Sequence, residues 1–177
     1  CPDRYVRLAA LLHDLGKPRA AAAQGNMHGH EDIGAQMAVE QLRQLKYDNR
    51  TIEIVSQLVK HHMFDLTGEA KTNTIKKKAA QLGKEQFTRL IALRRADFAG
   101  SSGAARADMA AVWQRVLDEM VRNQTPFSVN ELKIDGKDLM KLGIPEGRLL
   151  GQIKERLWQL CVLKPGQNKK ELLLKHA

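Results

Sequence analysis

Apolar residues recur three and four positions apart along almost the whole chain. Between residues 50 and 63, for example, Ile52, Val55, Leu58 and Val59 follow this spacing, which places them on one face of an α-helix. No segment shows a convincing alternation of apolar and polar residues, the pattern typical of a half-buried strand, and aromatic residues make up only 5% of the chain. The spacing therefore predicts an all-α protein.

Breaks in this pattern divide the chain into predicted helices. Gly16 and Pro18 are expected to end the first helix, and the segment from Ala20 to Ala23 is expected to be a loop or the end of a helix. After Pro126 the predicted elements become shorter, so we expect a helical domain at residues 1–125 and a smaller helical tail at residues 126–177. Helices are predicted at residues 4–14, 31–46, 50–63, 72–82, 85–99, 104–123, 128–132, 136–142, 146–163 and from 169 to the end.

The composition argues against a membrane or secreted protein. The longest uncharged apolar run is far shorter than the roughly 20 residues of a membrane-spanning helix, and no secretory signal pattern is present. The two cysteines, Cys1 and Cys161, match neither a zinc site nor a disulfide framework. We therefore expect a cytoplasmic protein with no membrane partner. Because the chain begins with Cys1 rather than methionine, we also expect it to be a fragment.

The net charge of +9 is unevenly distributed along the chain. Residues 1–70 carry 8 Lys and Arg against 9 Asp and Glu, whereas residues 71–177 carry 21 against 11. A basic surface next to a hydrolytic pocket is typical of proteins that bind a phosphate-rich ligand such as nucleic acid. The alternative is a solvated basic face with no partner, and the charge alone does not decide between the two.

The adjacent residues His13 and Asp14 are the first candidates for a metal site. They lie at the end of the first predicted helix, after Leu11 and Leu12, and imidazole and carboxylate are common ligands of divalent metals in hydrolytic sites. Neighbouring side chains on a helix point about 100° apart, so both can contact one metal only near the helix end. The alternative is that Asp14 caps a neighbouring helix and His13 packs beneath it.

Further histidines and one aspartate follow along the chain. His62 extends the apolar face of the predicted helix 50–63, and His61 lies close to the same face, so the spacing does not choose between them. His30 precedes a predicted helix start, where a local hydrogen bond is an alternative to metal binding. Asp97 falls on the apolar face of helix 85–99, where a carboxylate needs either a metal or a neighbouring arginine.

Several motifs together resemble one known family. They are Arg7–Pro18 (RLAALLHDLGKP), Gly29–Ala35 (GHEDIGA), Leu58–His62 (LVKHH) and Arg94–Asp97 (RRAD). The order His-Asp, His, His, Asp on a helical chain resembles the HD superfamily of metal-dependent phosphohydrolases. More closely, it is similar to the HD region of bacterial CCA-adding tRNA nucleotidyltransferases and related poly(A) polymerases. The segments Asp135–Ile144, Gly151–Ile153 and Pro165–Leu173 are similar to the C-terminal pattern of that family.

This resemblance implies an HD-type helical bundle followed by a body and tail that hold tRNA. It implies phosphohydrolase activity, as a phosphatase or a 2′,3′-cyclic phosphodiesterase, on a nucleotide or a terminal phosphate. The family transfers nucleotides with an N-terminal head that has no match here, so we expect such a head in the intact protein and no nucleotidyl transfer by this chain alone. The family pattern also begins with a histidine upstream of His13, so we expect a truncated HD domain with weakened or lost metal binding.

The resemblance also assigns roles to the candidate residues. It implies that His13, Asp14 and Asp97 hold a divalent metal such as Mg²⁺, Mn²⁺, Ni²⁺ or Co²⁺. His30 and His62, with His61, would complete a second metal site or contact phosphate. His13 and Asp14 would thereby take part in catalysis, and Lys17 would neutralise phosphate, unless it is simply solvated.

For the basic part of the chain, the resemblance implies contacts with the tRNA backbone. The predicted contacts are Lys76, Lys77, Lys78, Arg94, Arg95, Lys133, Lys137, Lys141 and Arg148. Two alternatives stay open at this point. One is a stand-alone HD-family nucleotide phosphohydrolase in place of a part of a tRNA nucleotidyltransferase, and the other is a metal-free helical module that binds RNA and keeps the HD residues only as structural remnants.

Overall fold

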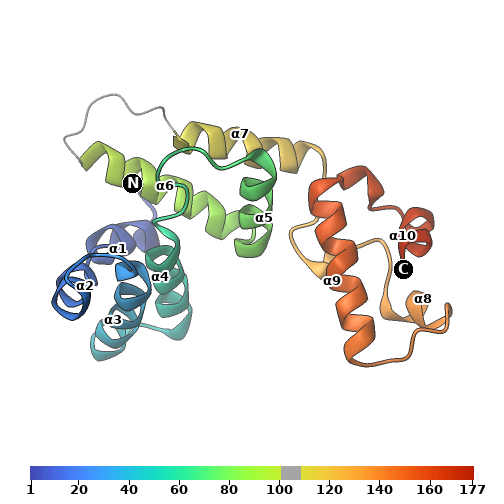
Figure 1. Ribbon diagram of the computed structural model, residues 1–177, viewed down its shortest axis with the longest axis horizontal. Helices are drawn as coiled ribbons and strands as arrows, with labels where there is room; N and C mark the ends of the chain where they lie inside the picture. Colours follow the sequence, from blue (N-terminus) through green and yellow to red (C-terminus); the bar gives the residue numbers. More distant parts are fainter. Residues whose placement is uncertain (101–108) are drawn as a thin grey trace. The chain divides into compact units, whose positions relative to one another are not determined.

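The computed structural model describes residues 1–100 and 109–177, and all regular structure within them is helical (Figure 1). The predicted all-α class is confirmed, since no strand occurs in the described ranges. The predicted start of the helix at 104–123 falls in residues 101–108, outside the described residues. The chain forms two compact units, Cys1–Glu69 with Glu85–Ala111 and Ala70–Lys84 with Val112–Ala177. The domain boundary at residue 125 stays a prediction.

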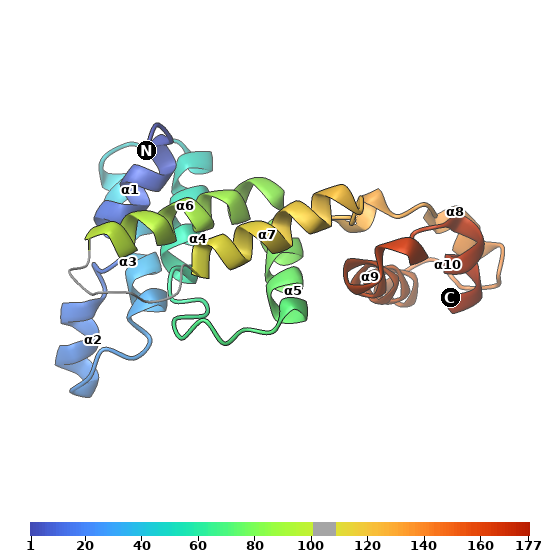
Figure 2. The same cartoon turned by 90° about the horizontal axis from the view of Figure 1, so that it is seen from above.

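Five helices build the first unit. They are α1 (Arg4–Leu12), α2 (Lys17–Gln24), α3 (His30–Gln44), α4 (Asn49–His61) and α6 (Lys84–Gly100). Helix α4 packs along both α3 and α1 (Figures 1 and 2). The carboxylate of Asp3 caps the first turn of α1, and that of Asp48 caps α4, so both helices start at a side chain that accepts their free N–H groups. Apart from α2, each of these helices lies close to its predicted range.

Helix α2 is a helix that the sequence did not predict at residues 17–24. Pro18 lies in the first turn of α2, where the missing N–H is not needed and the fixed φ favours a helix. The alanines at positions 20 to 23, predicted as a loop or helix end, continue this helix until Gly25, which has a φ of 70°. The same residues that stop one helix therefore start the next.

The turn between α1 and α2 lies directly against the first turn of α3. A Cβ atom added to Gly16 would lie 2.1 Å from the carbonyl oxygen of His30 and 2.6 Å from the backbone nitrogen of Gly34. Both glycines are buried. In the sequence, this contact is marked only by a glycine at position 34, inside a predicted helix. The contact brings Asp14 beside His30.

The second unit is built around α9. Its elements are α5 (Thr72–Leu82), α7 (Met109–Arg122, of which the first turn belongs to the first unit), η1 (Val129–Glu131), α8 (Gly136–Met140), α9 (Arg148–Leu163), η2 (Pro165–Gln167) and α10 (Lys170–His176). Its core around α9 consists of Leu132, Ile134, Leu139, Leu157, Cys161 and Leu173. The Asn168 side chain accepts from the Lys133 N–H and donates to the Glu131 carbonyl, which ties the loop before α10 to η1. Among the described residues, no helix combines the length and apolarity that a membrane crossing requires.

Candidate metal centre

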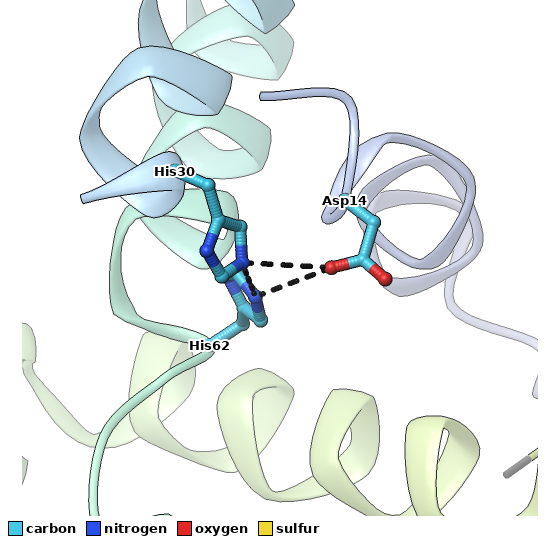
Figure 3. Close-up of side chains that lie close together, drawn as sticks. All are labelled: Asp14, His30 and His62. Atoms are coloured by element: carbon cyan, nitrogen blue, oxygen red, sulfur yellow. Dashed lines mark hydrogen bonds and ion pairs between the residues drawn. The ribbon is translucent and has the colours of Figure 1, made fainter. Parts of the chain in front are cut away.

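Three segments of the first unit bring Asp14, His30 and His62 together (Figure 3). Asp14 lies in the turn after α1, His30 is the first residue of α3, and His62 follows the last residue of α4. The Nε2 atoms of His30 and His62 lie 3.6 and 3.8 Å from Asp14 Oδ1 and 3.2 Å from each other. The histidines are only 2% and 6% exposed. One possible ligand atom from each residue therefore faces a common point.

The backbone fixes which nitrogen each histidine presents. The Nδ1 atom of each ring donates to the carbonyl oxygen three residues earlier, at 2.8 Å for His13, 2.8 Å for His30 and 2.6 Å for His62. A neutral imidazole that donates from Nδ1 carries its lone pair on Nε2. All three rings therefore direct an acceptor nitrogen toward the carboxylate of Asp14.

This arrangement suits a cation. In their neutral forms, His30 and His62 face each other with two acceptor nitrogens at 3.2 Å, and neither can donate to the other. A proton or a metal ion between such groups removes the unfavourable contact, and imidazole with carboxylate is a donor set for Mn²⁺, Fe²⁺, Co²⁺, Ni²⁺ and Zn²⁺. The residues present therefore fit a divalent metal.

His13 and Asp97 extend the group. The Nε2 atom of His13 lies 3.3 Å from Asp14 Oδ2 and 3.4 Å from Asp97 Oδ1, and its ring packs edge-on against the ring of His62. Asp97 comes from α6 and also lies 3.6 Å from Nη1 of Arg94, whose side chain is buried. The two carboxylates thus share one imidazole, and Arg94 offsets part of their charge.

Lys17 forms a hydrogen-bonded ion pair with the carboxylate of Asp14. Its Nζ atom donates to Asp14 Oδ2 at 2.6 Å. Burial acts to raise the pKa of Asp14, but the hydrogen bond and the charge of Lys17 act in the opposite direction, and the pKa is lowered. Burial lowers the pKa of His62. At neutral pH the centre therefore has an ionised Asp14 and a neutral His62, the protonation states in which both residues bind metal.

The structure brings His62 into this group and not His61, which ends α4 and is half-buried. Among the predicted RNA contacts, Lys76 is buried with its Nζ atom 2.7 Å from Glu119, and Arg94 is buried beside Asp97. Lys78 is half-buried. The exposed members of that set are Lys77, Arg95, Lys133, Lys137, Lys141 and Arg148.

Comparison with protein families gives one decisive match. The family model of the HD domain matches residues 2–98, more than half of the chain, and this span contains every residue of the candidate centre. The chain belongs to the HD domain family. Within this span the structure places His13 and Asp14 beside His30, His62 and Asp97.

Relatives of this HD domain protein include two proteins named as tRNA nucleotidyltransferases. The chain is 27% identical over 166 residues to the A-adding tRNA nucleotidyltransferase of Deinococcus radiodurans, covering 88% of this chain and 37% of that protein. It is 28% identical over 158 residues to the CC-adding tRNA nucleotidyltransferase of Thermus thermophilus, covering 86% of this chain and 35% of that protein. The chain therefore spans little more than a third of the length of these relatives. No solved structure matches it significantly.

Proposed function

We propose that the HD domain of this protein is a divalent-metal phosphohydrolase centre. The observation that carries the proposal is the convergence of three histidine Nε2 atoms on the carboxylate of Asp14, each ring being oriented by its own backbone carbonyl. Asp14, His30 and His62 would hold the metal, with His13 and Asp97 beside them. When bound, the metal would supply Lewis-acid activation of a phosphoryl oxygen and of water.

The other residues of the centre have separate tasks in this proposal. Lys17 orients Asp14 through its 2.6 Å hydrogen bond and lies at the half-exposed side of that carboxylate, where it can pair with a substrate phosphate. Arg94 holds Asp97 in place from the buried side through an ion pair at 3.6 Å. The buried rings of His30 and His62 exclude water from one side of the centre.

The direct test of this proposal is metal-dependent hydrolysis by the chain as it stands. After removal of metal with EDTA, the protein should hydrolyse 2′,3′-cyclic AMP or a nucleoside monophosphate only when Mn²⁺, Ni²⁺, Co²⁺ or Mg²⁺ is added back. Metal content is measured on the same samples by mass spectrometry. Turnover that survives complete metal removal contradicts the proposal. Absence of both metal binding and turnover favours the metal-free, RNA-binding alternative.

We further propose that the chain acts on or holds tRNA as part of a tRNA nucleotidyltransferase that carries a separate nucleotidyl-transfer head. The support is the similarity to two proteins of that name, together with the excess of basic residues after position 70. The exposed lysines Lys133, Lys137 and Lys141 would contact phosphates of the tRNA backbone. A role in tRNA processing, and two cysteines that are both free, agree with a cytoplasmic location.

Without these lysines, the chain should bind tRNA more weakly, and its affinity for tRNA should depend less on the salt concentration. The test variant combines Lys133→Gln, Lys137→Gln and Lys141→Gln. The plot of the logarithm of the tRNA association constant against the logarithm of the salt concentration should become less steep, by roughly 1 for each phosphate contact that is lost. Filter binding or fluorescence anisotropy with unmodified tRNA over a salt series measures this slope.

The matched control changes the same number of charges in the first unit. Arg43, Lys46 and Arg50 are exposed and lie outside the predicted contact set. Their triple exchange to glutamine should leave the slope unchanged. Equal losses in the two variants would show that only the net charge matters, and the proposed contact surface would be wrong.

A further inference from the structure

A cavity of about 490 Å³ lies between α5 and α9, entirely within the second unit. The two helices contact each other. The wall contains Lys77, Ala80 and Gln81 from α5 and Glu155, Trp158 and Gln159 from α9. None of these residues belongs to the metal centre, and the volume falls within the range of about 300–1,000 Å³ that is typical of small-molecule sites. The cavity is therefore a separate candidate binding site.

The deeper part of the cavity is apolar and contains a fixed aromatic ring. Ala80 and Val162 are buried, and Trp158 packs partly buried against the core around α9. The indole Nε1 of Trp158 donates to the Pro126 carbonyl oxygen at 3.0 Å, which satisfies the only donor of the ring and holds its orientation. An indole fixed in this way can stack with a flat aromatic ligand at little entropic cost, as in proteins that bind unpaired nucleobases.

The rim of the cavity carries hydrogen-bonding groups, the cation of Lys77 and the carboxylate of Glu155. Gln159 donates from Nε2 to Glu155 Oε1 at 3.2 Å, which orients its amide and leaves its carbonyl oxygen as an acceptor. Gln81 adds a second amide, and the exposed Lys77 adds an ammonium group. Amides suit the mixed donor and acceptor edges of nucleobases, and an ammonium group suits phosphate. A flat, edge-polar and anionic ligand combines these requirements.

We propose that the cavity between α5 and α9 binds an unpaired nucleotide, with the base against Trp158 and the phosphate near Lys77. This site is independent of the metal centre and of the tRNA contacts proposed for Lys133, Lys137 and Lys141. The nucleotide has two possible sources, a free mononucleotide or an unpaired base within RNA, which share the same chemistry. The experiment therefore tests a free mononucleotide and an unpaired base within RNA separately.

Intrinsic fluorescence provides the test, because the chain has two tryptophans and Trp113 is fully buried. A ligand in the cavity should quench Trp158 selectively. The probes are AMP, CMP, an unstructured oligonucleotide, an RNA duplex and ribose 5-phosphate, each added to the full chain. We expect quenching by the mononucleotides, by the oligonucleotide or by both, and none by the duplex or by ribose 5-phosphate, which offer no unpaired base.

Two variants connect the signal to the site. Lys77→Ala should weaken binding roughly threefold to fivefold, as expected for an exposed ion pair, and Trp158→Phe should remove the quenching signal. Lys175→Ala is the matched control, because Lys175 is an exposed lysine of α10 that does not line the cavity. The fluorescence readout requires no added metal and no turnover, so failure here is distinguishable from failure of the proposed hydrolase.

Each outcome of the fluorescence titrations either identifies the ligand or overturns the proposal. Quenching by mononucleotides identifies a free nucleotide as a ligand, and quenching by the oligonucleotide alone identifies an unpaired base in RNA. Equal responses to ribose 5-phosphate or to the duplex overturn the proposal, because they show anion binding without base recognition. No response to any probe up to about 10 mM, well above the Kd of even a weak millimolar site, also overturns it.

Discussion

Replacing Asp14 with alanine should abolish divalent-metal binding and reduce metal-dependent hydrolysis by about 100-fold or more. Loss of a group that merely orients a metal ligand commonly costs 10- to 100-fold in affinity or activity, and Asp14 is the carboxylate on which His13, His30 and His62 converge. Isothermal titration with Mn²⁺ and initial rates on 2′,3′-cyclic AMP measure the two effects. Circular dichroism shows whether the variant remains folded.

The matched control for Asp14→Ala is Asp32→Ala. Asp32 is an exposed carboxylate of the same unit, 3.3 Å from Lys60, so its removal makes the same change in charge away from the centre. Metal affinity and turnover should stay at the level of the unchanged protein. If Asp14→Ala retains normal metal affinity, the ligand assignment is wrong. If it binds metal normally and also hydrolyses normally, the proposed centre has no role in the reaction.

Gly16→Ala should destabilise the first unit by about 3 kcal/mol or more, at or beyond the upper end of overpacking effects. The added Cβ would lie 2.1 Å from the His30 carbonyl oxygen and 2.6 Å from the Gly34 nitrogen. Because both are backbone atoms, no side-chain rotation can relieve the contact, and the turn after α1 must move away from α3. Thermal unfolding should show a drop in Tm of roughly 10 °C.

The movement should also separate Asp14 from His30, so Gly16→Ala should bind metal more weakly under conditions in which it is folded. Gly151→Ala is the matched control, because Gly151 lies within α9 and an added Cβ meets no atom within 4 Å. That variant should be neutral or more stable by up to about 1 kcal/mol. A Gly16→Ala protein with unchanged Tm would mean that the close backbone approach is not a feature of the folded state.

The sequence predicts most helices because their start and stop signals are local. Helix α5 has the predicted range, and α3, α4 and α6 differ from prediction by one or two residues at each end. Pro18 shows why local signals do not always suffice. A proline two residues after a glycine is compatible both with the end of α1 and with the first turn of α2. The contact between Gly16 and Gly34 joins two separate turns of the chain, and local sequence patterns hardly predict it.

The sequence predicts which residues could form the candidate centre, but it does not predict the distances between their side chains. The order of His13, Asp14, His30 and Asp97 along the chain suggests a metal site, whereas the distances between them depend on how three helix ends meet. The choice between His61 and His62 illustrates this, because adjacent residues differ by about 100° around a helix axis. Only the packing of α4 against α1 and α3 settles which ring turns inward.

The carbonyl partners of the three histidines have a consequence for metal exchange. In many tightly held metal sites a second carboxylate accepts the Nδ1–H and makes the imidazole a stronger electron donor. Here each ring donates to a neutral peptide oxygen, and the Glu31 carboxylate stands off at 3.7 Å from His30 Nδ1, so the rings remain weaker donors. We expect a labile centre that equilibrates with the ions around it, and whose metal content after purification reflects the supply of metal in the cell and in the buffer.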